Sequence, residues 1–215
     1  MTFQRARRPE HKRLRYEAIL AAARALAERD GVRAVSLADI AGAVGMHKSA
    51  LLRYFETREE IYLRLAADDW RDWVAAMRAA LASLPAGAVA ELAAAFATTL
   101  AERPLLCDLL THAPLNLERN VSLETVREFK RTAVGSVDEL SAQVRTVLPA
   151  LTDQDAFDLV GSVSLLAAGL WQLGRPTETL QELYELEPEL GYGGLPFVPT
   201  LTRLTTTIIR GLLTA

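Results

Sequence analysis

The chain has 215 residues, of which 50% are hydrophobic and 24% are charged, a composition typical of a soluble globular protein. Its longest uncharged run covers residues 159–174, shorter than the roughly 20 apolar residues that span a bilayer, so we expect a buried helix there and no membrane partner. Cys107 is the single cysteine and excludes an internal disulfide, which fits a cytoplasmic location.

The two ends of the chain carry opposite charge. Residues 1–55 contain 11 Lys and Arg against 5 Asp and Glu, whereas residues 56–215 contain 13 against 22. The formal net charge of −3 conceals this division. A basic segment joined to an acidic remainder is typical of a module that binds a polyanion, followed by one that does not.

The first ten residues are basic and polar and contain Pro9, a pattern that predicts a flexible arm before the first helix. Two interpretations of its arginines stay open. Arg5, Arg7 and Arg8 either reach into a minor groove or belong to a mobile terminus without a partner.

Residues 36–55 predict two short helices around a glycine turn. Ser36 is a good N-cap, and Asp39 stands where a capping box needs its carboxylate, so a helix begins at about residue 37. Gly45 supplies the positive φ of the turn. The apolar positions fall on one helical face: Leu37, Ile40, Ala41 and Val44.

The following helix is expected to start near His47. Leu51 and Phe55 share a face and are predicted to pack inward. The remaining side chains suit phosphates and base edges: His47, Lys48, Ser49, Arg53 and Tyr54. An apolar face that packs inward and a polar face that points outward predict a DNA-reading helix-turn-helix. The alternative is a plain helical hairpin whose charged side chains are only solvated.

Residues 16–65 resemble the N-terminal domain of the tetracycline-repressor (TetR) family. A first helix ends at Asp30-Gly31, and then come two motifs in order: Ser36-Leu-x-x-Ile40-Ala41-x-x-x-Gly45 and Lys48-x-x-Leu51-x-x-Tyr54-Phe55-x-x-Arg58-Glu59-x-Ile61. A weaker likeness lies in Ala168-Gly-Leu-Trp171-Gln-Leu.

The resemblance implies that Ser36 faces a phosphate while it caps its helix, and that Tyr54 and Arg58 bind two further phosphates. Leu52 and Ala50 depart from the family pattern, which removes two expected phosphate contacts. Leu52 either touches a thymine methyl or packs against the neighbouring helix. His47 either reads a base or is a turn residue without a contact.

Alanine and leucine dominate the rest of the chain, with glycine and proline at plausible helix ends, which predicts an all-α fold. We expect residues 1–10 to form the arm, 11–57 the DNA-binding domain and 58–215 a ligand-binding and dimerisation domain. The helices of the last domain are predicted at 58–83, 88–102, 104–113, 122–148, 152–174, 177–186 and 201–213, with a loop at 114–120 between the third and the fourth.

Dimerisation is predicted from two apolar helices, because their small residues permit close approach. The alternative is that both helices pack inside one protomer. A homodimer would place two recognition helices on a near-palindromic double-stranded operator. The expected interface consists of Val160, Val163, Ser164, Ala167, Ala168, Trp171, Leu201, Leu204, Ile208 and Leu212.

The TetR resemblance further implies a repressor that an unidentified small apolar or amphipathic molecule releases from its operator. Large flat side chains enclose space well, although each is also an ordinary core residue. The candidates for the lining of such a pocket are Trp70, Trp73, Met77, Phe96, Cys107, His112, Phe129 and Trp171.

An enzyme is the competing class, and the sequence shows no catalytic or metal-binding arrangement. Cys107 and His112 are five residues apart, a poor spacing for a nucleophile and its base on one helix. The three histidines lack metal-ligand spacing, so we expect neither a metal nor another cofactor. A helical adaptor whose hairpin binds protein instead of DNA remains the other alternative.

Overall fold

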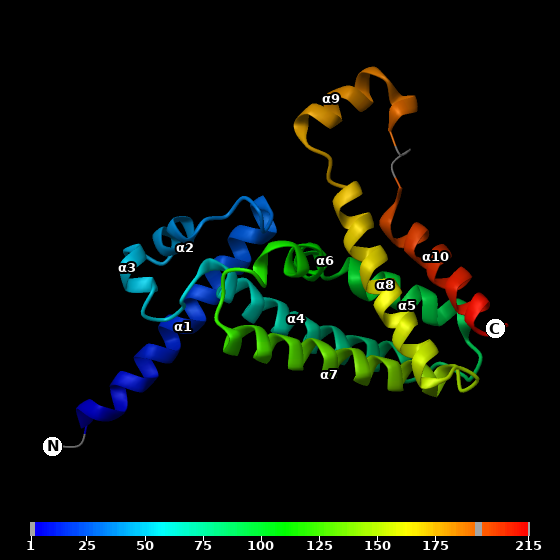
Figure 1. Ribbon diagram of the computed structural model, residues 1–215, viewed down its shortest axis with the longest axis horizontal. Helices are drawn as coiled ribbons and strands as arrows, with labels where there is room; N and C mark the ends of the chain where they lie inside the picture. The colour runs from blue at the N-terminus through cyan, green and yellow to red at the C-terminus, as the bar shows by residue number, and fades with distance from the viewer. Residues whose placement is uncertain (1–2, 192–194, 215) are drawn as a thin grey trace.

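The structure, a computed structural model, describes residues 3–191 and 195–214, and for residues 3–9 the backbone only. Within these ranges it contains helices and no strand, so the all-α prediction is confirmed (Figure 1). We call residues 3–57 the head and the described residues from 58 onward the body. The helices are α1 (Phe3–Asp30), α2 (Leu37–Ala43), α3 (Lys48–Leu51), α4 (Arg58–Leu81), α5 (Val89–Ala101), α6 (Pro104–His112), η1 (Ala113–Leu117), α7 (Leu123–Val147), α8 (Asp153–Leu173), α9 (Glu178–Leu186), η2 (Pro188–Leu190) and α10 (Phe197–Leu212).

The first helix differs from the flexible arm expected over residues 1–10, because α1 already begins at Phe3. Elongation of a formed helix adds one hydrogen bond per residue, and Pro9, in the second turn, removes one such bond without ending the helix. Residues 1 and 2 and the side chains of Arg5, Arg7 and Arg8 lie outside the described part. At its other end α1 stops at Asp30, where Gly31 has a φ of 84°.

The caps of α2 form as predicted. The Ser36 hydroxyl accepts a hydrogen bond from the Asp39 N–H at 3.2 Å, and the Asp39 carboxylate accepts one from the Ser36 N–H at 2.8 Å. Gly45 follows the helix with a φ of 64°. Ile40 and Ala41 are buried, as the apolar face requires. Short-range hydrogen bonding therefore fixes the start of α2 and the turn after it.

The body consists of packed helix layers. In Figure 1, α4 and α7 run side by side along its length and α8 is steeply inclined to them, with α6, α7 and α10 as its main neighbours. Ser122 caps α7, and Thr152 caps α8 through a second capping box with Asp155. The helix ends agree with the prediction within about four residues. The prediction of a loop at 114–120 is corrected, because the first part of this segment belongs to the π-helix η1, which continues α6.

By length and composition alone, α8 is long and apolar enough to cross a membrane, but a single helix of this kind is weak evidence for a membrane span. One of its faces is buried against α6, α7 and α10. The core helix of a globular protein has the same properties. By contrast, α9 buries no residue and projects beyond the rest of the body (Figure 1).

Candidate DNA-binding surface and effector pocket

The recognition segment is short and well anchored. His47 is the N-cap residue of α3, with an extended backbone (φ −72°, ψ 146°) and no side-chain cap bond. Leu51 and Phe55 are buried as predicted, and Phe55 stacks on Tyr16 of α1 with 4.7 Å between ring centroids. This packing fixes the orientation of the outer face. The exposed side chains there are His47, Lys48, Ser49, Leu52 and Arg53.

The side chains of Leu52 and Tyr54 lie in different surroundings. Leu52 is 45% exposed and is not among the side chains packed against the hydrophobic core, which favours the interpretation that it faces outward. Tyr54 is half-buried and packs against the core of the head. Ser36 is exposed at the start of α2 while its hydroxyl takes part in the capping box. The start of α2 and the recognition segment thus offer two exposed serine side chains, two cations and one apolar side chain.

Arg58 makes several contacts within the chain. Its Nε and Nη2 atoms donate to the carbonyls of Val35 and Val32, and its Nη1 lies 3.0 Å from the Glu59 carboxylate. The guanidinium also covers the ring of Tyr62 at 4.8 Å. Two of its nitrogens thus hold the loop before α2 and the third pairs with Glu59 of α4; a phosphate contact of Arg58 stays a prediction and would compete with these bonds.

Asp108, on α6 of the body, holds the same loop from the other side. Its Oδ2 accepts the Val32 N–H at 2.7 Å, and its Oδ1 accepts the Gln172 amide at 2.8 Å. His112, one turn further along α6, lies 3.5 Å from the carboxylate. Burial acts to raise the pKa of Asp108, but the hydrogen bonds from His112, Val32 and Gln172 outweigh it and keep the pKa below its usual value. The carboxylate is thus ionised at neutral pH and ties α6 to the head.

A hollow of about 740 Å³ lies beside this junction. Its walls come from both head and body and include Arg33, Asp108, His112 and Arg175. A second tie crosses between α1 and α4, where Arg24 Nη2 lies 2.5 Å from Asp69 Oδ1. The head is therefore attached to the body by polar contacts that border an open cleft, in addition to a hydrophobic core that continues from the head into the body.

A smaller pocket of about 190 Å³ lies inside the body between α4, α6, η1 and α7. Its walls are mostly apolar, with one ion pair between Glu118 and Lys130. Trp70 and Phe129 are the two predicted residues that line it. The complete lining is Ala66, Trp70, Leu106, Leu109, Leu110, Ala113, Pro114, Glu118, Phe129, Lys130 and Ala133.

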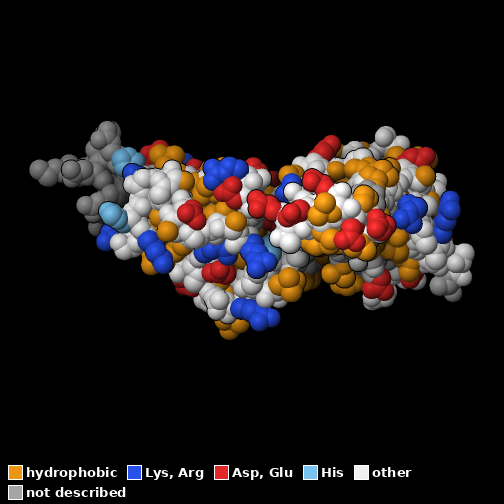
Figure 2. Space-filling view, turned by 90° about the horizontal axis from the view of Figure 1, so that it is seen from above, with side chains coloured by type: hydrophobic (Ala, Val, Ile, Leu, Met, Phe, Trp, Pro, Cys, Tyr) orange, Lys and Arg blue, Asp and Glu red, His pale blue; other side chains and the backbone are white. Residues whose placement is uncertain are grey.

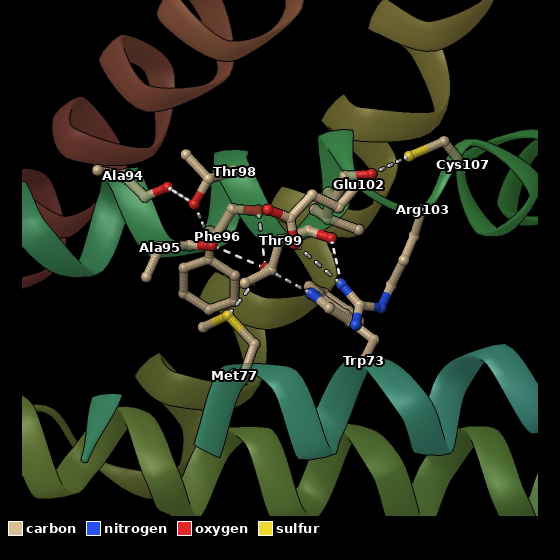
Figure 3. A network of polar contacts seen from close by, with 11 residues as sticks. Trp73, Met77, Ala94, Ala95, Phe96, Thr98, Thr99, Glu102, Arg103 and Cys107 are labelled. Atoms are coloured by element: carbon tan, nitrogen blue, oxygen red, sulfur yellow. Dashed lines mark hydrogen bonds and ion pairs between the residues drawn. The ribbon is translucent and has the colours of Figure 1, made fainter. Parts of the chain in front are cut away.

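Four other predicted pocket residues belong to the core beside α5, as Figure 3 shows. The Trp73 indole donates to the Thr99 hydroxyl at 3.0 Å, and this hydroxyl lies 3.2 Å from the Met77 sulfur. Burial raises the pKa of the Cys107 thiol to about 12, so it stays protonated. The prediction is corrected for these side chains, because bulk that is able to line a cavity also fills a core: Trp73, Met77, Phe96 and Cys107.

The last two predicted pocket residues also lie outside the 190 Å³ pocket. His112 faces the Asp108 junction and the larger hollow. Trp171 is covered by the Arg175 guanidinium at 3.9 Å and meets Phe197 edge-on at 5.9 Å between centroids. His112 therefore belongs to the junction with the head, whereas Trp171 lies between the end of α8 and α10. Neither lines the 190 Å³ pocket, and their assignment to it is corrected.

The predicted dimer face of α8 points into the protomer. Six of the expected interface residues are buried within one chain, so they are corrected to core: Val160, Val163, Ser164, Ala167, Ala168 and Leu201. Leu204, Ile208 and Leu212 of α10 are partly exposed, as is Trp171. The opposite face of α8 is the uncovered one, and we call it the α8 stripe: Phe157, Gly161, Leu165, Gly169 and Leu173.

Sequence reasoning missed the Asp108 junction and the Glu118–Lys130 ion pair. Asp108 and His112 are four residues apart, which places them on one helix face. This spacing is visible in the sequence, but Val32, the partner of Asp108 on the head, is 76 residues away. Glu118 and Lys130 belong to separate helical segments, and their spacing of 12 residues carries no recognisable pattern.

Family models match nearly all of the chain. The model of bacterial regulatory proteins of the tetR family matches residues 19–65, and that of the tetracyclin repressor-like C-terminal domain matches residues 67–215. Among curated protein sequences none matches the chain.

Solved structures show the same fold. A transcriptional regulator from Pseudomonas aeruginosa PAO1 has a TM-score of 0.56 at 17% identity, with 94% of this chain and 92% of that one covered. The fatty acid degradation regulator FadR from Bacillus halodurans has a TM-score of 0.54 at 16% identity, with coverage of 92% and 94%.

A third structure, from Thermobifida fusca YX-ER1, is a transcriptional regulator of the TetR/AcrR family, with a TM-score of 0.51 at 19% identity and coverage of 89% and 96%. Its fold and the two family models agree with the helix-turn-helix in the head. The chain therefore belongs to the TetR family of DNA-binding transcriptional regulators.

Proposed function

We propose that this protein is a repressor that binds a near-palindromic operator as a homodimer and leaves it when a small molecule enters the 190 Å³ pocket. One observation carries the coupling: α6 lines the pocket with Leu106 and Leu109 and, between them, presents Asp108 to the head. A ligand that displaces α6 acts on the loop before α2 through this carboxylate. We further expect the protein to act in the cytoplasm, where bacterial DNA lies.

For the DNA contacts we propose the exposed side chains at the start of α2 and along the recognition segment. Lys48 and Arg53 are the cations of this surface, and both are exposed. Hydrogen bonds to phosphates and base edges are the contacts that such side chains make in a major groove. The proposed contact residues are Ser36, His47, Lys48, Ser49, Leu52, Arg53 and Tyr54.

For dimerisation we propose the α8 stripe together with the outer face of α10. Leu165 is 75% exposed in the single chain, and apolar side chains in such a row favour burial against another surface. Gly161 and Gly169 alternate with the large side chains and let a partner helix approach closely. A two-fold interface would pair each stripe with its own copy.

The experiment that tests the function is selection of bound duplexes from a random pool. We expect an enriched sequence with two related half-sites, because a two-fold symmetric dimer reads a near-palindrome. Absence of any enrichment, even at low salt, would contradict the DNA-binding proposal and favour the adaptor.

Charge-removal variants then locate the surface. Lys48→Ala combined with Arg53→Ala should weaken operator binding. The slope of the logarithm of the binding constant against the logarithm of the salt concentration should fall in magnitude by about one for each lost phosphate contact. Arg71→Ala combined with Arg131→Ala removes the same charge from exposed positions of the body. This control should bind like the parent; equal losses in both double variants would argue against the proposed surface.

A further inference from the structure

The mouth of the 190 Å³ pocket already holds a positive charge between an anion and an aromatic ring. The Lys130 ammonium lies 2.7 Å from Glu118 Oε1 and 5.8 Å from the centroid of the Phe129 ring. All three residues line the pocket. A carboxylate and a ring face are the surroundings that an organic ammonium prefers. The lysine thus marks the position that the cationic head of a ligand would take.

Exposure differs between the two partners of this ion pair. The Lys130 side chain is 51% exposed, whereas that of Glu118 is 20% exposed. Lysine has a flexible four-carbon stem and swings into water at little cost. The side chain of Glu118 is shorter than that of lysine. Glu118 directly follows η1, and its backbone N–H donates a hydrogen bond to the Ala113 carbonyl. Lys130 is therefore the partner that an incoming ligand displaces.

Displacement of Lys130 leaves the Glu118 carboxylate beside an apolar cavity without its counter-ion. An unpaired charge in such a place is unfavourable, and a ligand that brings a positive charge removes the penalty. An anionic ligand would have to expel Glu118, the less exposed group. The charge arrangement thus favours a cation over an anion.

The rest of the pocket defines the body of the ligand. Trp70, Leu109 and Pro114 are among the walls, and their apolar surface suits a hydrocarbon or an aromatic ring. The volume of about 190 Å³ resembles that of an engineered protein cavity that holds benzene, about 150 Å³. One aromatic ring with a short tail matches this size.

We propose that the pocket binds a small organic ammonium ion, with its apolar ring between Trp70 and Leu109 and its charged head in place of the Lys130 ammonium. The regulatory meaning of this site rests on the proposed function, whereas the binding itself does not.

Three compounds with the same ring and tail test the charge preference: 3-phenylpropylammonium, 3-phenylpropan-1-ol and 3-phenylpropionate. Each is titrated into the full-length protein by calorimetry at pH 7 without DNA. We expect the ammonium to bind at least about tenfold more tightly than the alcohol, and the carboxylate to bind most weakly. Tightest binding of the carboxylate, or no binding of any compound at millimolar concentration, would overturn the proposal.

Two variants assign the preference to the ion pair. Glu118→Gln should abolish the difference between ammonium and alcohol and leave the affinity for the alcohol unchanged, which also shows that the pocket is intact. Lys130→Met removes the competing ammonium and should tighten binding of 3-phenylpropylammonium. Glu124→Gln, at an exposed carboxylate that pairs with Arg127, is the matched control. A preference that survives Glu118→Gln would refute the assignment.

An operator-release assay separates this proposal from the proposed function. If 3-phenylpropylammonium binds with the expected preference but does not weaken operator binding, the ammonium site stands and the coupling to DNA fails. If the protein binds DNA and none of the three compounds, the DNA function stands and the ammonium site fails.

Discussion

At Asp108 a single buried carboxylate accepts hydrogen bonds from the head and from α8. Groups of this kind are costly to leave unpaired, because a buried acceptor that loses its partner does not regain its bonds to water. Arg58 holds the same loop through the carbonyls of Val32 and Val35. The loop before α2 is thus fixed from both α4 and α6, and these two residues contribute to the position of the helix-turn-helix on the body together with the Arg24–Asp69 pair and the shared hydrophobic core.

We expect Asp108→Asn to lower the free energy of unfolding at pH 7 by about 2 kcal/mol, the usual worth of hydrogen bonds to a charged group. The folded-state pKa of Asp108 lies below the unfolded value of 3.8. The stabilisation is therefore complete above pH 3.8 and is lost as the pH falls through the folded-state pKa. Urea denaturation at pH 7 and near pH 3 measures both effects.

A matched control for this prediction is Asp138→Asn at an exposed position of α7. It should leave stability unchanged at both pH values. A gap between the parent and Asp108→Asn that stays the same in acid would show that the carboxylate charge does not support the junction.

Residues with local roles are predictable from the sequence, and residues with distant partners are not. Ser36, Gly45 and Leu51 act within a few positions of themselves, so capping, turn and periodicity rules find them. Arg58 is found by the family pattern, yet its partners, 23 and 26 residues back, are not. Tertiary packing decides such cases, and a linear pattern does not record it.

The same distinction holds for whole helices. Caps and proline or glycine breaks set the ends of α7 and α8 locally, so their ranges could be predicted. The inward face of α8 could not be predicted, because apolar residues surround nearly the whole helix and its periodicity is weak. Only the neighbours α6, α7 and α10 decide which side is buried.

The uncovered face of α8, the α8 stripe, allows a test of the proposed dimer interface. Leu165→Glu places a charge at the centre of the α8 stripe and should convert the dimer to a monomer at micromolar concentration, because the proposed interface would bury that charge without a partner. Light scattering coupled to size exclusion measures the mass.

Leu123→Glu is the matched control, since Leu123 of α7 is 72% exposed, close to the 75% of Leu165. It should remain dimeric. Dissociation of both variants, or of neither, would count against an interface at the α8 stripe.

On the scale of the molecule, the charge separates along the long axis. Residues 1–55 contain 11 Lys and Arg against 5 Asp and Glu, and residues 56–215 contain 13 against 22. On the face in Figure 2, charged side chains of both signs lie along the whole length, and hydrophobic side chains gather over the part that holds the end of the body. Long-range attraction to DNA therefore acts mainly on the head, whereas the acidic body is repelled. A molecule so polarised approaches a duplex with the helix-turn-helix first.

Two such heads joined through their bodies should read two half-sites on one side of the duplex, about one helical turn apart. Insertion of about five base pairs between the half-sites rotates one of them to the opposite side of the helix. Only one head then binds, and the affinity should fall roughly a hundredfold or more, as expected when a linked second contact is lost. Leu165→Glu, as a monomer, should bind the original and the extended operator equally. Equal affinity of the parent protein for both duplexes would mean that the two heads do not act together, and the operator would then be read by single heads.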